Sequence, residues 1–376
     1  MQTRRRFHQL ALAGLALPAA DAARAQERGL VLGQSVPLSG PAAQLGLQMQ
    51  IGARAYFEAV NAAGGVGGLP IVLKTLDDGY DPERCRANTE RFVHDEVFAL
   101  FGYVGTPTSL AALPLATAAR LPFIAPFTGA ESLRAPFNRL VFHIRASYDD
   151  ETELIVKQLT QLDLKKIAVF HQNDAYGQAG LKGVQRALEK RGLQPLAVAT
   201  VERNSADVAA ALKALLPGQP EAIVQISAYK SCAAFIREAR RAGWGGQFYN
   251  VSFVGTQALA DELGRDAAGV VVSQVMPSPF GAAAGLVEDY QQALRRFDAK
   301  SEPNYTSIEG YLAARVVVDG LRRLGSRPTR EGLVAALETL SGYESRGYRL
   351  QFSPNRHVGS SFVELSMLTA DGKVRR

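Results

Sequence analysis

The sequence contains very little cysteine. Only Cys85 and Cys232 occur among the 376 residues. Two cysteines that lie about 150 residues apart make neither a disulfide framework nor a cysteine-rich metal cluster. A single long-range bridge between them stays open. Hydrophobic residues make up 47% of the chain, which is ample material for two apolar cores.

The motifs of common enzyme classes are also absent from the sequence. There is no G-x-S-x-G nucleophile elbow, no phosphate-binding loop, no H-E-x-x-H and no C-x-x-C. The histidines are scattered, and His143 and His171 lie at the ends of predicted strands, where a structural role is expected. We therefore expect a protein that is not an enzyme and that uses no metal and no cofactor.

Two clusters that resemble functional motifs favour structural roles. The glycines at 64–68 follow a predicted helix and precede a strand, whereas a dinucleotide fingerprint needs the order strand, glycines, helix. They predict a helix C-cap and a tight turn. Asp77 and Asp78 end a predicted strand, and the acids at 149–151 open a helix, where negative charge complements the helix dipole.

Long hydrophobic runs are missing apart from one near the N-terminus. The basic segment around Arg4–Arg6 is followed by an apolar stretch from Leu10 to Ala20 and then by an A-x-A pattern that ends at Ala25. This stretch is shorter than the roughly 20 residues that cross a bilayer. Residues 1–25 are therefore predicted to be an export signal cleaved after Ala25. The twin arginine favours the Tat route, with the Sec route as the alternative.

Neither sign of charge is in large excess once the predicted signal is removed. Removing residues 1–25 takes away four arginines and one aspartate, which lowers the formal net charge from +6 to +3. No cluster of lysine and arginine is interleaved with aromatic residues. A nucleic-acid partner is therefore not expected.

Short apolar runs alternate with amphipathic stretches along the rest of the chain. The first set of predicted strands is 30–36, 71–77, 97–102, 123–125 and 141–144, with helices at 45–62, 82–95 and 108–119. The second set is 167–171, 196–201, 222–227, 247–251 and 270–275, with helices at 150–161, 177–191, 206–215 and 229–242. This alternation predicts an α/β protein with parallel sheets, arranged as two doubly wound, Rossmann-like lobes.

The last hundred residues do not continue the alternation. Helices are predicted at 283–299, 307–324 and 329–340, followed by closing strands at 348–352 and 362–368. Such a tail has to be divided between the lobes, so we expect the chain to cross between them more than once.

Four turns at the carboxyl ends of predicted strands are rich in small polar and aromatic residues: 36–40, 103–109, 126–130 and 227–230. Ligands of parallel α/β sheets bind at this edge, and free N–H groups at helix N-termini favour anions. Thr106 followed by Pro107 predicts a threonine N-cap with proline at the first helical position. Each turn alone is equally compatible with helix capping.

Six motifs in this order resemble a known family: Pro37-Leu-Ser-Gly-Pro41, Val60-Asn-Ala-Ala-Gly-Gly-Val66-Gly, Asp77-Asp-Gly-Tyr-Asp-Pro82, Gly102-Tyr-Val-Gly-Thr106, Asn173-Asp-Ala-Tyr-Gly177 and Arg240-Arg-Ala-Gly243. From about residue 29 to 373 the chain resembles type I periplasmic binding proteins, in the branch of the leucine/isoleucine/valine receptors of ABC importers. The resemblance implies hinge closure on a small ligand, a monomer located in the periplasm, and an ABC permease of the inner membrane as partner.

The resemblance also implies a three-segment hinge. The crossovers are expected near Ala146, Met276 and Arg346. Residues 26–146 and 277–346 would then form lobe 1, and residues 147–276 and 347–376 would form lobe 2.

The ligand-binding positions implied by the resemblance come from both lobes. Thr106 stands where relatives hold the ligand carboxylate, and Leu45 replaces a tyrosine of the cleft. Tyr176 and Tyr229 match tyrosines that close the pocket. The remaining expected positions are Phe127, Thr128, Gly129, Tyr148, Ser252 and Phe253.

Ser252 stands where the amino-acid receptors carry the acid that pairs with the ligand ammonium. Burying an ammonium without a charge partner costs several kcal/mol. An amino acid would need another carboxylate, such as Asp149 or Asp150. We therefore expect a small carboxylate-bearing ligand, either amino acid-like or an aromatic acid. The alternative function is a sensing receptor that signals to a membrane kinase or chemoreceptor.

Overall fold

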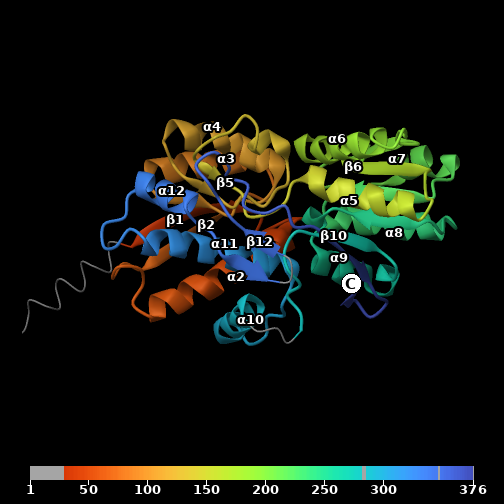
Figure 1. The fold of residues 1–376 in the computed structure, drawn as a ribbon. Helices are drawn as coiled ribbons and strands as arrows, with labels where there is room; N and C mark the ends of the chain where they lie inside the picture. The colour runs from red at the N-terminus through yellow and green to blue at the C-terminus, as the bar shows by residue number, and fades with distance from the viewer. Residues whose placement is uncertain (1–28, 282–284, 346–347, 376) are drawn as a thin grey trace, which may run out of the picture.

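The computed structural model describes residues 29–281, 285–345 and 348–375 and contains two lobes, each built around its own β-sheet (Figure 1). The predicted export signal with its cleavage site at Ala25 lies outside the described residues. The crossover expected near Arg346 lies outside them too.

The first sheet has five parallel strands in the order β2-β1-β3-β4-β5. Helices cover both faces, with α3 and α4 on one face and α2 and α11 on the other (Figure 1). The strands are β1 (Leu30–Val36), β2 (Ile71–Asp77), β3 (Ala99–Phe101), β4 (Phe123–Ile124) and β5 (Val141–Phe142). The helices are α2 (Ala43–Ala62), α3 (Pro82–His94), α4 (Thr106–Ala118), α10 (Leu286–Phe297), α11 (Tyr305–Arg322) and α12 (Arg330–Glu338).

Two glycines allow α2 and α11 to approach each other closely. A Cβ atom on Gly52 would lie 1.8 Å from the backbone oxygen of Ser307, and one on Gly310 would lie 2.2 Å from that of Met49. Any side chain at these positions would push the helices apart. The contact draws the C-terminal part of the chain onto the first lobe.

The second sheet has seven strands in the order β14-β13-β10-β9-β8-β6-β7. The strands from β6 to β10 run parallel, whereas β13 and β14 are antiparallel additions at one edge. The strands are β6 (Ile167–Gln172), β7 (Val198–Val201), β8 (Ala222–Ile226), β9 (Gln247–Asn250), β10 (Val271–Gln274), β13 (Glu364–Leu368) and β14 (Val374–Arg375). The helices are α5 (Tyr148–Gln161), α6 (Ala175–Glu189), α7 (Ala209–Leu215), α8 (Tyr229–Arg241) and α9 (Thr256–Leu263).

Local sequence explains where the helices begin. Asp81 caps α3 by accepting from two backbone N–H groups, and Pro82 fills the first turn. Ser147 and Asp150 form a capping box at the start of α5. Strands β6 and β8 are buried along their whole length, as expected for central strands covered by helices on both faces. The predicted α/β architecture with two parallel sheets is confirmed.

The end of the chain departs from the predicted pattern. Strand β12 (Tyr348–Leu350) pairs with β11 (Tyr343–Ser345) instead of joining the second sheet. Val358 bridges His143 beside the first sheet, and the chain enters the second sheet only at β13. The domain boundaries near 146, 276 and 346 stay a prediction.

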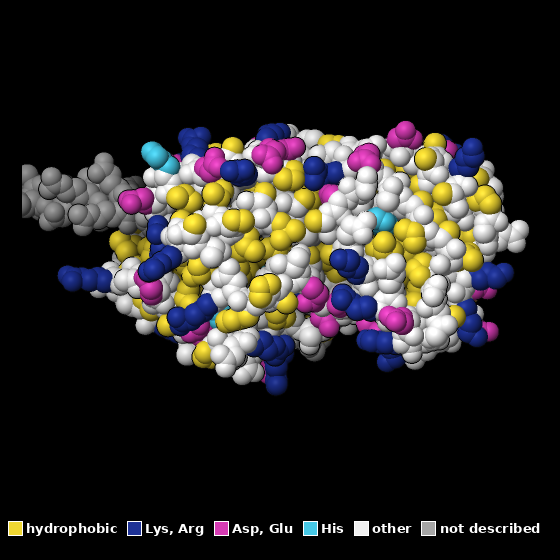
Figure 2. Space-filling view, turned by 90° about the horizontal axis from the view of Figure 1, so that it is seen from above, with side chains coloured by type: hydrophobic (Ala, Val, Ile, Leu, Met, Phe, Trp, Pro, Cys, Tyr) yellow, Lys and Arg dark blue, Asp and Glu magenta, His cyan; other side chains and the backbone are white. Residues whose placement is uncertain are grey.

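Both cysteines are buried and free, Cys85 in α3 of the first lobe and Cys232 in α8 of the second. Among the described residues no helix is long and apolar enough to span a bilayer. The same residues contain no group of histidine, cysteine and acidic side chains suited to a metal ion. On the face shown in Figure 2, acidic and basic side chains are interspersed without a continuous band of one sign.

Candidate functional site

The lobes face each other at the carboxyl ends of their parallel strands, and the cleft between them is closed. Gln172 Nε2, at the end of β6, donates to the hydroxyl of Tyr80 on the first lobe at 3.2 Å. Asn204 Nδ2 donates to the carbonyl oxygen of Gly79 at 3.0 Å. These hydrogen bonds tie the loop after β2 to the second lobe.

Five aromatic rings meet in this closed cleft and form what we call the aromatic cluster: Tyr80, Phe127, Tyr148, Tyr176 and Phe253. Phe253 is central, with its ring centroid 4.5 Å from Tyr176, 5.5 Å from Phe127 and 5.8 Å from Tyr80. Tyr148 lies 5.3 Å from Tyr176. All five side chains are buried. Aromatic rings from both lobes therefore pack together in one apolar cluster.

Each ring is positioned by a strand end or a helix start. Phe127 follows β4, and its N–H donates to the carbonyl of Tyr103 at 2.7 Å. Tyr176 lies in the first turn of α6, where Asp174 accepts from its N–H at 2.9 Å. Phe253 lies in a 3-10 turn (Ser252–Val254) directly after β9. The cluster thus collects residues that parallel strands deliver to the sheet edge.

Tyr80 is held in an uncommon backbone conformation. Its φ is 62°, and Asp78 Oδ1 accepts from its N–H at 2.8 Å. Its ring lies over the turn before α4, where a Cβ atom on Gly105 would be 2.3 Å from the ring. Gly105 itself has a φ of 104°. Only glycine meets both requirements at that position.

Thr106, the predicted anion-binding residue, lies at the start of α4, but the N-cap residue of this helix differs from the one expected. Gly105 is the N-cap, and Thr106 is the first helical residue, so the predicted threonine cap is wrong. The hydroxyl of Thr106 instead lies 2.6 Å from that of Thr128. Both threonines are fully buried. The two hydroxyls satisfy each other next to a helix N-terminus.

A buried ionic network lies beside the aromatic cluster, where β5 leads into α5. Arg145 is fully buried, with its guanidinium 4.4 Å from the centre of the Phe127 ring. Its Nη2 donates to Ser252 Oγ, and its Nε lies 3.6 Å from Glu309 Oε1 on α11. Arg145 therefore contacts groups from both lobes.

Glu151 completes this network from the second lobe. Its carboxylate accepts from Ser252 N–H at 2.7 Å, from Ser252 Oγ at 3.0 Å and from Ser273 Oγ at 2.6 Å. We call Arg145, Glu151, Ser252, Ser273 and Glu309 the hinge network. Glu151 is well provided with donors, whereas Glu309 Oε1 has no hydrogen-bond partner among the described residues.

Burial and the neighbouring charges together set the pKa values of Glu309, Glu151 and Arg145. Burial raises the pKa of Glu309 to about 7, and the like charge of Glu151 adds to this while Arg145 opposes it. Burial also raises the pKa of Glu151, against Arg145 and three hydrogen bonds. For Arg145, burial disfavours the charged form, but the two carboxylates outweigh it and raise its pKa. Arg145 is therefore charged, and Glu309 titrates near neutral pH.

Several polar atoms in the cleft lack partners within the described residues. They include Nη1 of Arg145 and the hydroxyl of Tyr176. A void of ≈ 10 Å³ lies against the hinge network and Phe127. That space holds about one water molecule. A larger ligand has to displace side chains or separate the lobes.

The other predicted positions lie around this centre. The carbonyl of Gly129 accepts from Tyr148 N–H at 2.7 Å. Leu45 packs across the cleft, because a Cβ atom on Gly255 would be 2.4 Å from Leu45 Cδ2. Tyr229 lies outside the aromatic cluster, and its hydroxyl accepts from Gln44 N–H at 3.5 Å.

Two acids considered for the cleft are occupied elsewhere. Asp149 forms an ion pair with Arg186, and Asp150 caps α5 through Ser147. Both carboxylates already have partners within the protein, and the alternative that either one pairs with a ligand ammonium stays a prediction. Within the hinge network the acids are Glu151 and Glu309.

Sequence reasoning missed Tyr80, Arg145 and Glu309. Tyr80 and Arg145 each follow a predicted strand at the same sheet edge as Thr106, which was the available signal. Glu309 carried a signal as well, because it is an acid within a helix whose neighbours Ile308 and Tyr311 are apolar. No local pattern shows that these residues meet, since they are brought together by three separate elements.

Comparisons with known proteins agree with this architecture. A crystal structure of a possible leucine/isoleucine/valine-binding protein from Rhodopirellula baltica SH 1 is 35% identical and covers 93% of this chain and 96% of its own, with a TM-score of 0.88. A substrate-binding periplasmic protein from Ralstonia solanacearum is 32% identical over 92% of this chain and 99% of its own, with a TM-score of 0.86.

A curated relative supports the same assignment. The Leu/Ile/Val-binding protein homolog 7 of Brucella melitensis is 24% identical over 98% of this chain and 95% of its own length. The profile described as periplasmic binding protein matches residues 30–373. The resemblance inferred from the motifs is thus confirmed, and a solute-binding role replaces any enzymatic one. The chain belongs to the periplasmic binding protein family, with the type I fold and in the leucine/isoleucine/valine-binding branch.

Proposed function

We propose that this chain is a periplasmic receptor that closes on a small aromatic carboxylate and delivers it to an ABC permease of the inner membrane. The importer partnership, the export signal cleaved after Ala25 and the monomeric state are parts of this proposal. Membership of the solute-binding family supports the receptor role. The ligand class is supported by the cleft itself.

The aromatic cluster is the single observation that carries the ligand class. Five rings from two lobes surround the closed cleft, with centroid separations of 4.5 to 5.8 Å among them. Aromatic pairs at such separations contribute about 0.5–1.5 kcal/mol beyond area burial. A planar ring inserted between Phe253 and its neighbours would recover these contacts, whereas a branched aliphatic chain would recover only dispersion.

The polar surroundings support a carboxylate on that ring. Thr106 and Thr128 present hydroxyls at the N-terminus of α4, where free N–H groups favour an anion. The Tyr176 hydroxyl is buried and has no partner in the described part of the chain, and burial raises its pKa well above the ordinary value, so it is a neutral donor.

An α-amino acid fits the described cleft less well. Ser252 cannot supply the charge that a buried ammonium needs, and Asp149 and Asp150 are engaged elsewhere. Glu309 Oε1 has no hydrogen-bond partner among the described residues, but the guanidinium of Arg145 lies 3.6 Å from it and would repel an ammonium. Leucine and valine, named for several relatives, are therefore not proposed as ligands here.

A ligand panel on the mature chain, residues 26–376, tests the proposal. We expect phenylacetate and benzoate to raise the melting temperature by several degrees, since ligand at about 100 times Kd adds about 2.7 kcal/mol. The variant Phe253→Ala should lose this shift, and Phe137→Ala, an exposed ring remote from the cleft, serves as the matched control. Strong stabilisation by leucine or valine with no effect of aromatic acids would refute the ligand class.

The importer role needs a cellular measurement. Cells lacking the chain should take up labelled phenylacetate more slowly, and a plasmid copy should restore uptake. Normal uptake in the deletion strain, together with a lost signalling response, would favour the sensing receptor instead.

A further inference from the structure

Arg145 differs from the other arginines of the described chain in being fully buried. It lies where β5 leads into α5, so the groups that it contacts come from both lobes. Its Nη2 is used by Ser252 and its Nε faces Glu309, while Nη1 has no partner among the described residues. A guanidinium with a free N–H in a buried site is an efficient receptor for a carboxylate.

The guanidinium is also held in a fixed orientation. It lies 4.4 Å from the centre of the Phe127 ring, and Ser252 Oγ holds its Nη2. Phe127 in turn contacts Phe253 at 5.5 Å. Arg145 therefore lines the void together with Phe127 of the aromatic cluster.

We propose that Arg145, rather than the hydroxyl pair Thr106–Thr128, receives the carboxylate of the ligand through its free Nη1. This inference rests on the proposed function, because it assigns the polar end of the same cleft. It makes Arg145 the residue that selects an anionic ligand over a neutral one.

The charges around the hinge network are consistent with this role. Arg134 is the second cation near Glu309, and it donates to four backbone carbonyls. Glu131 and Asp150, which also face Arg134, are partly exposed to solvent. When Glu309 is protonated, the buried Arg145 and the partly exposed Arg134 carry two positive charges against the one buried carboxylate of Glu151, and an anion is favoured. When Glu309 is ionised, that excess disappears.

Binding of an anion should therefore be linked to a proton. An additional negative charge beside Glu309 raises its pKa further above about 7, so the complex takes up a proton near neutral pH. The protonated carboxyl can then donate a hydrogen bond to the ligand carboxylate. A structural ion pair that does not touch the ligand would show no such linkage.

Isothermal titration with matched probes tests the inference. Phenylacetate and phenylacetamide share the ring and differ in charge, and phenethylamine carries the opposite charge. We expect the wild type to bind phenylacetate about 10- to 100-fold more tightly than phenylacetamide, the range for a hydrogen bond to a charged group. Titration in two buffers of different ionisation enthalpy should show proton uptake at pH 7.

Variants then identify the residue that binds the ligand carboxylate. The pair Arg145→Gln with Glu309→Gln removes both charges at similar volume, and it should reduce the acid-to-amide preference to about threefold or less. Thr106→Val removes the alternative hydroxyl and should leave the preference unchanged. Glu309→Gln alone keeps Arg145 and should abolish proton uptake while retaining the preference.

The outcomes are separable. If neither phenylacetate nor phenylacetamide binds, the proposed function fails. Three results would show that Arg145 does not bind the ligand carboxylate, although the ligand class can stand. They are equal binding of both probes, tightest binding of phenethylamine, and loss of the preference in Thr106→Val alone. If the double variant does not fold, the absence of proton uptake by the wild type would still overturn the inference.

Discussion

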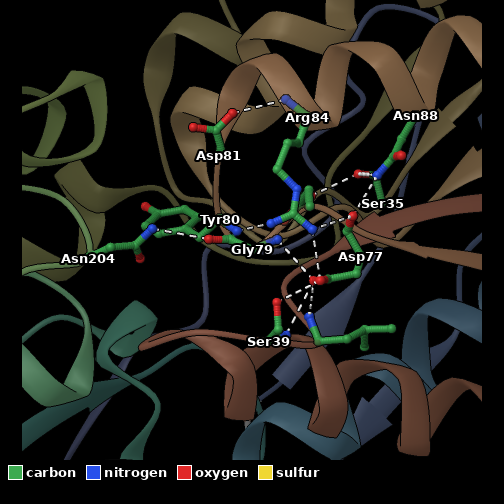
Figure 3. A network of polar contacts seen from close by, with 11 residues as sticks. Ser35, Ser39, Asp77, Gly79, Tyr80, Asp81, Arg84, Asn88 and Asn204 are labelled. Carbon is green, nitrogen blue, oxygen red and sulfur yellow. Dashed lines mark hydrogen bonds and ion pairs between the residues drawn. The ribbon is translucent and has the colours of Figure 1, made fainter.

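Two polar networks of similar composition flank the cleft, and they are built very differently. The rim network lies in the loop after β2 and centres on Asp77, whose carboxylate accepts from Leu38 N–H, Ser39 and Gly79 N–H and pairs with Arg84 (Figure 3). Partial burial disfavours the Asp77 charge, but these donors outweigh it and lower its pKa to about 2. Each lone pair of this carboxylate is used.

The hinge network is buried and incompletely satisfied. Glu309 has a pKa raised to about 7, and both Glu309 Oε1 and Arg145 Nη1 lack hydrogen-bond partners within the described chain. Satisfied networks fix a loop, whereas unsatisfied buried groups are costly unless something else binds them. The comparison indicates that the rim is structural, and it supports the proposal that a ligand completes the bonding of the hinge network.

The largest expected effect is on stability. Arg145→Leu removes the buried cation that pairs with Glu309 and neutralises Glu151, and it should lower the free energy of unfolding by about 3–5 kcal/mol, as for other broken buried ion pairs. Arg84→Leu removes an ion pair whose arginine side chain is 53% exposed, and it should cost about 0–1 kcal/mol. Urea denaturation of both variants measures the contrast. Equal losses would mean that the two networks do not differ as described.

Much of this architecture could be predicted from the sequence, because strand–helix alternation and apolar runs are local signals. Phe127, Tyr148, Tyr176 and Phe253 were expected at the cleft, and the structure brings their rings together. Their binding role remains a proposal. The hinge network could not be predicted, since residues 145, 151, 252 and 309 are far apart in the sequence and meet only in the folded chain.

The errors have physical causes. A threonine before a proline predicts an N-cap, but Gly105 takes that position because the Tyr80 ring leaves no room for a side chain there. The strand at 348–352 has the right composition for the second sheet, yet β12 finds its partner in β11 a few residues earlier. In both places, the N-cap of α4 and the pairing of β12, contacts between distant or neighbouring segments outweigh the local sequence pattern.

The second expected effect is the pH dependence of stability. The pKa of Glu309 is about 7 in the folded protein and 4.5 as its ordinary value, so between these values the folded state holds a proton that the unfolded state has lost. Stability should therefore be greatest below pH 4.5 for this group and fall as the pH rises towards 7. Glu309→Gln should flatten the melting temperature over this window. A wild-type profile that rises with pH, and that the variant does not change, would contradict the assignment.

A smaller effect is expected when the rim loses its acceptor. Asp77→Ala leaves the N–H groups of Leu38 and Gly79 without their partner and should cost about 1–2 kcal/mol of unfolding free energy. Asp77→Asn keeps an acceptor oxygen and should cost less. Thermal unfolding at pH 7 compares the two. Equal losses for asparagine and alanine would show that charge, rather than acceptor number, holds the loop.

The smallest effect concerns closure of the cleft. Asn204→Ala removes the hydrogen bond to Gly79 (Figure 3). Tyr80→Phe removes the one from Gln172 while keeping the ring in the aromatic cluster. Each bond links the lobes only when they are closed, and each is worth about 0.5–1.5 kcal/mol. The Kd for phenylacetate should therefore rise about 2- to 10-fold in either variant, with unchanged stability of the ligand-free protein. The rim contributes only to closure of the cleft, whereas Arg145 is proposed to select the charge of the ligand. The acid-to-amide preference should therefore stay at its wild-type value in both variants. A reduced preference would mean that the rim network and the hinge network act as one binding site.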